Sequence, residues 1–158
     1  MMTNPDGLID LEAGQMAKNM FSRAKAEGYD KFILSSAYRS ISYQQQLFDA
    51  RKAQDASYGD KPYLEPVKVM PGKNSEHTTG LALDILIDGI DEEEYFLSDH
   101  GKWLNENAAN YGFILRYPEG KEHLTGVIYE PWHYRYVGVE AAKEIKAKGL
   151  CLEEYVTP

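Results

Sequence analysis

The sequence predicts an α+β fold in which a small central antiparallel sheet is flanked by helices. Four segments carry apolar residues at helical spacing, and between them lie short stretches typical of strands. The strands cannot all be parallel, because the connector 118–126 resembles a hairpin loop. At 158 residues the chain is long enough for one hydrophobic core and short for two, so we expect a single domain over 1–158.

The first part of the chain is expected to contribute two helices and a strand. Apolar residues recur at helical spacing over 11–27, and Gly28 ends the pattern. KFILSSAY (31–38) is typical of a strand. Ser40 or Ser42 can cap the helix that follows through YQQQLFDARKAQ, since a serine oxygen accepts a hydrogen bond from a free backbone N–H.

The rest of the chain is expected to supply the other strands and helices. Segment 59–74 holds three prolines and two glycines, which predicts a loop, and 88–95 is an acidic turn. The remaining predicted elements are a strand at 81–87, a helix at 96–112, strands at 113–117 and 127–138, and a helix at 139–149.

Composition excludes several classes of protein. A net charge of −8 argues against a nucleic-acid surface, and no segment approaches the ~18 to 20 apolar residues that span a bilayer. One cysteine, Cys151, forms no internal disulfide and is expected to act as a small hydrophobe. The first residues have no basic region followed by an apolar core, so we do not expect them to act as a signal peptide as they stand. We expect a cytoplasmic protein, or an extracytoplasmic, membrane-anchored one if an export segment has been removed.

One aspartate lies within an otherwise apolar stretch. An ionised Asp84 without a partner in LALDILI would cost several kcal/mol or become protonated. Its partner can be an arginine, a network of donors or a metal ion, and a structural ion pair is an open alternative. His77 lies shortly upstream, and Gly80 allows a turn, so the two side chains can converge.

The segment YEPWHYRYVG adds a second histidine and a glutamate. His133 and Arg135 share one face of a strand, whereas Glu130 has the wrong parity. Pro131 marks where the chain must bend to bring Glu130 to the same site. Two histidines and a carboxylate are a common catalytic zinc set with a fourth position for water, whose proton Glu130 could take. Glu130 could instead be a surface carboxylate.

Three further positions carry weaker signals. Arg39 follows the first strand, where it could bind a carboxylate or an oxyanion, or form a surface ion pair. We expect His100 and His123 to be solvated. The acidic turn at 91–94 could bind calcium, but a solvated turn is the simpler interpretation.

Taken together, these motifs resemble those of the LAS metallopeptidases, which include lysostaphin-type enzymes, D-Ala-D-Ala carboxypeptidases and the sonic hedgehog signalling domain. SEHTTGLALD is similar to the SxHxxGxAxD motif, and EPWH to the second, ExxWH-type motif. AYRSISYQQ resembles the YRSxxxQ segment of D,D-carboxypeptidases and D,D-dipeptidases, including the vancomycin-resistance enzymes of VanY and VanXY type. The similarity covers about 32–138.

The resemblance implies a role for each matching residue. It implies that one zinc ion is bound by His77, Asp84 and His133. It also implies that Glu130 is the general base and that Arg39 binds the substrate carboxylate or the developing oxyanion. The positions that match the family's substrate pocket are Gln44, Ser75, Tyr117 and Trp132.

The implied activity is a zinc-dependent D,D-carboxypeptidase that removes the C-terminal D-Ala from D-Ala-D-Ala-ended peptidoglycan precursors or stem peptides. A D,D-dipeptidase acting on free D-Ala-D-Ala and an L,D-carboxypeptidase acting on tetrapeptide stems are open alternatives. A non-catalytic zinc-bearing binding domain is a third, against which Glu130 and Arg39 both count. A role in wall maturation or in glycopeptide resistance stays open, and so does a dimer in place of the expected monomer.

Overall fold

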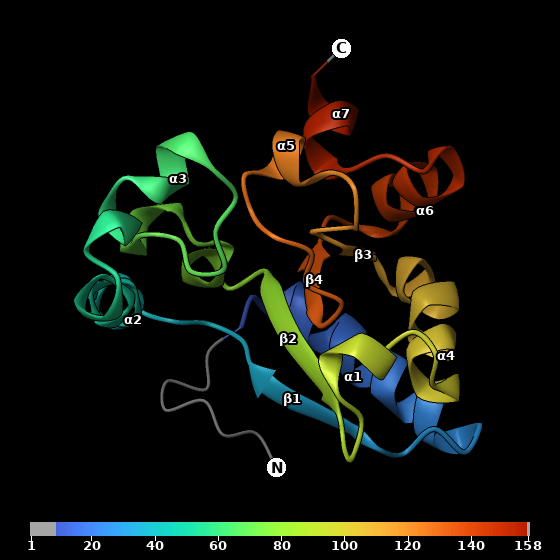
Figure 1. The fold of residues 1–158 in the computed structure, drawn as a ribbon. Helices are drawn as coiled ribbons and strands as arrows, with labels where there is room; N and C mark the ends of the chain where they lie inside the picture. Colours follow the sequence, from blue (N-terminus) through green and yellow to red (C-terminus); the bar gives the residue numbers. More distant parts are fainter. Residues whose placement is uncertain (1–8, 158) are drawn as a thin grey trace.

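A four-stranded antiparallel sheet lies at the centre of the computed structural model, which describes residues 9–157 (Figure 1). The strands follow the order β1-β2-β4-β3. Their bounds are Phe32–Ser36 (β1), Ala82–Ile87 (β2), Phe113–Leu115 (β3) and His133–Tyr136 (β4). The predicted α+β fold is therefore confirmed. The prediction about a signal peptide or export segment concerns residues 1–8, which lie outside the described part of the chain.

Helices surround this sheet, and α1, α2, α4 and α6 begin close to the predicted residues. The bounds of the helices are Leu11–Ala26 (α1), Ile41–Gln54 (α2), Lys61–Leu64 (α3), Asp99–Asn107 (α4), Glu122–Thr125 (α5), Val139–Lys148 (α6) and Leu152–Val156 (α7). Ser40 caps α2, as one of the two predicted alternatives, and its hydroxyl accepts a hydrogen bond of 3.2 Å from the backbone N–H of Tyr43. No helix within residues 9–157 has both the length and the apolar content needed to span a membrane.

The hydrophobic core lies between one face of the sheet, α1 and α4 (Figure 1). Alternate residues of a strand point to opposite faces, so Leu83 and Ile85 of β2 enter the core while Asp84 faces away from it. Met20 of α1 and Leu104 of α4 are fully buried against them. This packing gives Asp84 a rigid support on the opposite side of the sheet.

Replacing Leu104 by alanine tests this core. Leu104→Ala should lower the free energy of unfolding by about 2–5 kcal/mol, because the buried side chain leaves a cavity. Leu97→Ala is the matched control, since Leu97 is 73% exposed and its truncation should change stability by about 0.5 kcal/mol or less. Urea denaturation monitored by circular dichroism measures both. Equal effects of the two variants would contradict the core assignment.

Local structure departs from the prediction in the segment 59–74. It was expected to be a loop, but it contains the helical turn α3 and a 3₁₀ turn at Gly72–Asn74. Pro62 stands at the start of α3, where proline costs no hydrogen bond because the first N–H groups of a helix have no intrahelical acceptor. The prolines therefore start a helical turn here rather than prevent one.

Two other predicted elements are shorter in the structure. The helix expected over 96–112 begins at Asp99, because the Ser98 hydroxyl accepts a hydrogen bond of 3.0 Å from Gly101 N–H. Its last turn is a separate 3₁₀ helix, and Gly112 ends it with φ of 82°. The strand expected over 127–138 is confined to β4. Helix α7 was not predicted, and it begins after Cys151, which is buried as expected.

Candidate metal centre and cleft

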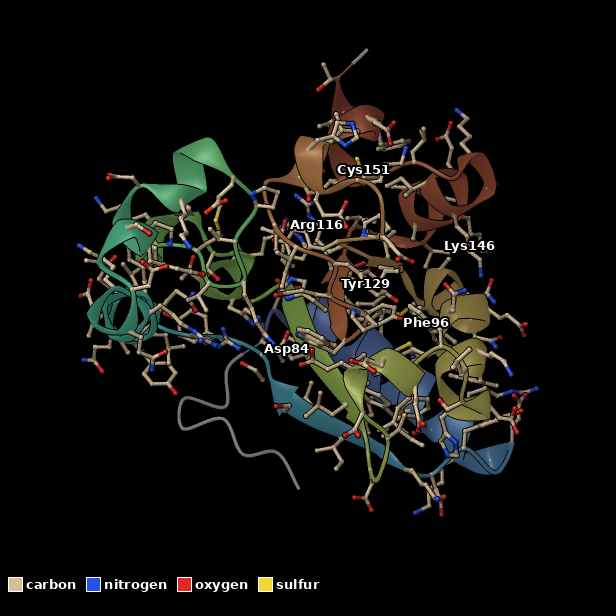
Figure 2. The ribbon with its side chains drawn as sticks, in the orientation of Figure 1. Asp84, Phe96, Arg116, Tyr129, Lys146 and Cys151 are labelled. Carbon is tan, nitrogen blue, oxygen red and sulfur yellow. The ribbon has the colours of Figure 1, made fainter. Side chains whose placement is uncertain are left out.

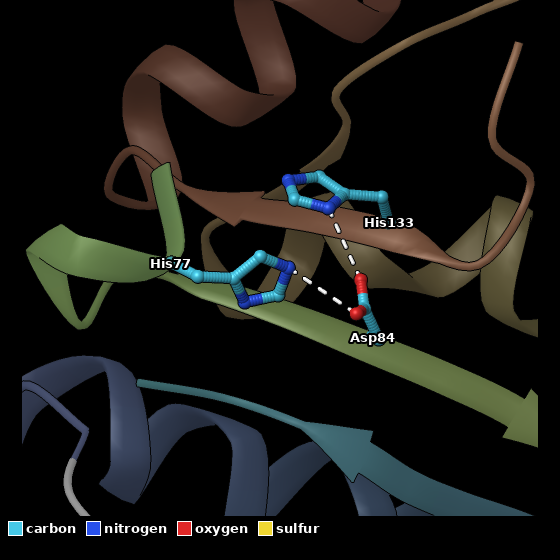
Figure 3. Close-up of side chains that lie close together, drawn as sticks. All are labelled: His77, Asp84 and His133. Carbon is cyan, nitrogen blue, oxygen red and sulfur yellow. Dashed lines mark hydrogen bonds and ion pairs between the residues drawn. The ribbon is translucent and has the colours of Figure 1, made fainter. Parts of the chain in front are cut away.

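The pairing of β2 with β4 places two of the predicted ligand residues side by side. Asp84 and His133 are direct partners in this antiparallel pair. Side chains of such partners lie on the same face of the sheet with Cβ atoms about 4.5–5.5 Å apart. Asp84 Oδ1 is 3.1 Å from His133 Nδ1 (Figure 3).

His77 reaches the same point from a 3₁₀ turn. The turn Glu76–Thr79 ends at Gly80, whose φ of 74° suits glycine because it has no Cβ. His77 Nδ1 lies 2.6 Å from the carbonyl oxygen of Ala37, to which it can donate its proton. The other nitrogen, Nε2, then faces Asp84 Oδ2 at 3.2 Å (Figure 3).

These three side chains could hold a metal ion. One ligand atom from each of His77, Asp84 and His133 lies within 4.8 Å of the others, and all three residues are buried. Two imidazole nitrogens and a carboxylate oxygen suit a zinc ion with an open position. The bond from His77 Nδ1 to a backbone carbonyl is the contact that orients metal-binding histidines. The ligand role of these residues stays a prediction.

The charges at this centre depend on one another. Burial on its own would raise the pKa of Asp84, but the two neighbouring histidines hold that pKa far below its usual range. Burial would lower the pKa of His133, but Asp84 and Glu76 outweigh it and raise the pKa to about 9. Asp84 is therefore a carboxylate in a setting that attracts cations.

Arg39 is held at the edge of this centre by three hydrogen bonds. Its Nη2 donates to Asp84 Oδ2 at 2.7 Å, its Nε to Ser36 Oγ at 2.8 Å, and its Nη1 to Gln44 Oε1 at 3.1 Å. Gln44 is itself fixed by a bond of 2.9 Å to the carbonyl oxygen of Met70. The partners of Asp84 are thus an arginine and two histidines, and Arg39 is not a surface ion pair.

Glu130 returns to the site through a tight turn. The backbone N–H of His133 donates to the carbonyl oxygen of Glu130 at 3.2 Å, with Pro131 in the turn between them. The predicted bend at Pro131 is therefore present. Glu130 Oε2 lies 3.7 Å from His133 Nδ1. Glu130 is only 5% exposed, so the alternative that it is a surface carboxylate is excluded. Burial raises the pKa of Glu130 to about 7, so its carboxyl can gain or lose a proton near neutral pH.

A cleft of about 520 Å³ opens beside these residues. Its volume is within the range of small-molecule sites. The four positions predicted to line a substrate pocket all border it, namely Gln44, Ser75, Tyr117 and Trp132. The Tyr117 ring lies 4.8 Å from the His133 ring, and Lys68 Nζ lies 4.8 Å from the centre of the Trp132 ring.

Residues that the sequence did not single out lie behind the centre. Glu76 Oε1 accepts a hydrogen bond from Arg116 Nε at 2.7 Å and forms an ion pair with Arg135 Nη1 at 3.0 Å. In the view of Figure 2, Arg116 lies between Asp84 on β2 and Cys151 before α7. The signal that could have found Glu76 is Arg135, which shares a strand face with His133 and needs a counter-charge.

The predictions for two further histidines and for the acidic turn had different outcomes. The expectation that His100 is solvated is wrong, because its ring packs edge-on against Tyr29 at 5.3 Å and Phe32 at 5.5 Å. The first turn of α4 carries it onto these rings. His123 is exposed, as expected. The acidic turn around Glu92–Glu94 is also exposed, and in the described part of the chain it forms no group that could hold a metal ion.

Comparison with known proteins gives consistent matches. Residues 7–139 match the family model described as VanY, D-alanyl-D-alanine carboxypeptidase. The D-alanyl-D-alanine carboxypeptidase of Enterococcus faecalis is 42% identical over 153 residues, which cover 94% of this chain and 55% of that protein. The chain spans about half the length of this protein and of two further curated relatives that it matches.

Two solved structures are similar over most of the chain. The LdcB LD-carboxypeptidase is 43% identical with a TM-score of 0.82, and the match covers 93% of this chain and 67% of that one. A variant of the vancomycin-resistance D,D-pentapeptidase VanY, in complex with Zn(II), is 37% identical with a TM-score of 0.77. That match covers 99% of this chain and 88% of the other.

Proposed function

The chain belongs to the D-alanyl-D-alanine carboxypeptidase family of VanY type, and from this premise we propose that it is a zinc-dependent D,D-carboxypeptidase. It removes the C-terminal D-Ala from D-Ala-D-Ala-ended peptidoglycan precursors or stem peptides. The observation that carries the proposal is the convergence of His77, Asp84 and His133 in a cleft that also holds Glu130 and Arg39.

The three converging side chains are the proposed holders of one zinc ion. When bound, zinc supplies a Lewis acid for the scissile carbonyl and for the attacking water. His77 Nε2, His133 Nδ1 and an Asp84 oxygen already face a common point. The contact of His77 Nδ1 with the Ala37 carbonyl favours the tautomer in which Nε2 carries the free lone pair.

Glu130 is the proposed general base. Its carboxyl is buried beside the centre, 3.7 Å from His133, so it is within reach of a water in the cleft. Oε2 would accept the proton of the attacking water and pass it to the departing amine. A carboxyl whose pKa is about 7 suits both steps near neutral pH.

Arg39 is proposed to select a free C-terminus. Its guanidinium borders the cleft and is locked by Ser36, Gln44 and Asp84, yet a guanidinium has five N–H donors and these contacts use three. The free donors can bind the terminal carboxylate of a peptide or the oxyanion that forms during its cleavage. This contact favours removal of a terminal residue over cleavage within a chain.

A set of matched substrates tests the function and this contact together. Zinc-loaded protein is incubated with a pentapeptide that ends in D-Ala-D-Ala, and with the same peptide amidated at its C-terminus. We expect release of D-Ala from the free acid and about 100-fold slower cleavage of the amide, because the guanidinium loses its charge-assisted hydrogen bonds to the substrate carboxylate. Arg39→Lys should narrow this ratio. If the amide is cut as fast as the acid, the carboxylate contact is wrong.

The same assay distinguishes the alternative activities. Similarity to the LdcB LD-carboxypeptidase supports a second candidate, an L,D-carboxypeptidase that shortens tetrapeptide stems. A tetrapeptide substrate and free D-Ala-D-Ala are therefore included, and the substrate with the highest kcat/KM assigns the activity. Zinc binding without hydrolysis of any of these substrates would point to a non-catalytic binding domain instead.

A further inference from the structure

The carboxylate of Glu76 lies on the far side of His133 from the proposed metal. Glu76 Oε2 is 3.5 Å from His133 Nε2, and the Glu76 side chain is 12% exposed. Neither of these two atoms has another hydrogen-bond partner among the described residues. A buried carboxylate oxygen and a buried ring nitrogen therefore face each other, and each is the available partner of the other.

The position of Glu76 does not depend on His133. Glu76 Oε1 is held by Arg116 Nε at 2.7 Å and Arg135 Nη1 at 3.0 Å, which leaves Oε2 directed at the imidazole. Arg116 is in turn held by two hydrogen bonds of 2.9 and 2.5 Å to the carboxylate of Glu153 on α7. The chain of contacts runs from α7 to the back of the metal centre.

The two nitrogens of His133 have different tasks in this arrangement. Nδ1 faces Asp84 at 3.1 Å, so it is the nitrogen that can bind the metal. A neutral imidazole carries one proton, and Nδ1 has a free lone pair only when that proton is on Nε2. A carboxylate opposite Nε2 stabilises this tautomer and raises the basicity of the ligand nitrogen.

We propose that Glu76 is a positioning residue, which holds the His133 proton on Nε2 and so makes Nδ1 the metal-binding atom. The inference rests on the proposed function, because it assigns His133 as a zinc ligand. Glu76 touches neither the cleft nor a substrate in this role. It acts through His133, and Arg116 and Arg135 keep it in place.

Glu76→Gln tests the proposal with little change in shape. Because Arg116 donates a hydrogen bond to Oε1 and Arg135 is paired with the same oxygen, the amide oxygen should take that place and the amide NH₂ should face His133 Nε2. A donor at this point favours the tautomer with the proton on Nδ1. We expect zinc affinity to fall about 10- to 100-fold, measured by competition with a chromophoric chelator. The visible spectrum of the Co²⁺-loaded protein should also change.

Glu153→Gln is the matched control. It weakens the pair with Arg116 but leaves Glu76 opposite His133, so thermal stability should fall while zinc affinity stays within about threefold of wild type. Affinity of Glu76→Gln within about threefold of wild type, with an unchanged Co²⁺ spectrum, would overturn the proposal. So would an equal loss in both variants, which would indicate a general structural effect.

A measurement on the wild-type protein covers the case in which Glu76→Gln does not fold. Long-range ¹H–¹⁵N spectra of the zinc-loaded protein should show His133 bound through Nδ1, with a protected proton on Nε2. Binding through Nε2, or rapid exchange of that proton, would refute the role of Glu76. If the wild-type protein binds no zinc at all, it is the proposed function that fails.

Discussion

Glu130→Gln should lower kcat by about 10²- to 10⁴-fold while the protein keeps its zinc. Glutamine preserves the size of the side chain and the turn to His133, but its amide cannot accept and return a proton at Oε2. The proposed metal-binding atoms belong to His77, Asp84 and His133, none of which is changed. Loss of turnover without loss of metal would therefore separate proton transfer from metal binding.

Release of D-Ala from the pentapeptide and zinc content by mass spectrometry measure the two effects on the same samples. Glu119→Gln serves as the control, because Glu119 is an exposed glutamate on the connector between β3 and β4. It should match wild type in both measurements. A Glu130→Gln enzyme that retains activity within about tenfold of wild type would remove Glu130 from the role of general base.

Removal of the metal is expected to abolish hydrolysis, and one equivalent of zinc should restore it. His77→Ala should have the same effect permanently, because it deletes one of the three proposed ligands and also the contact that Nδ1 makes with Ala37. Removal of a supporting contact alone lowers metal affinity about 10- to 100-fold. We expect the zinc affinity of His77→Ala to fall further than that.

Dialysis against a chelator, followed by activity and metal assays, provides the measurement. His123→Ala is the control, since it removes an exposed histidine that lies outside the proposed centre. That variant should bind zinc and cleave the substrate as wild type does. Full activity after chelation, or stoichiometric zinc in His77→Ala, would show that the three side chains do not form the working metal site.

Elements that depend on near neighbours in the chain were predicted well. Helix α1 follows from apolar spacing, and Ser40 caps α2 because a serine oxygen reaches an N–H group three residues away. The bend at Pro131 followed from strand parity alone, and the structure has a turn there. The segment 59–74 was misjudged, because a proline can start a helical turn as well as exclude one.

The sequence by itself determined which residues were available for the chemistry. An aspartate inside an apolar strand required a partner, and the two spaced motifs supplied His77, His133 and Glu130. Their resemblance to a metallopeptidase family led to the family that the comparisons show. Such signals can be read from sequence because they arise from residue type and short-range spacing.

Only the tertiary structure decided how these residues meet. The register of β2 against β4 places Asp84 opposite His133, 49 positions away, and a shift of one residue would turn either side chain to the other face. The contact of Glu76 with Arg116 joins segments 40 positions apart. Long-range strand pairing and packing determine which buried charged side chains lie in contact. Short-range spacing in the sequence therefore could not predict these pairs.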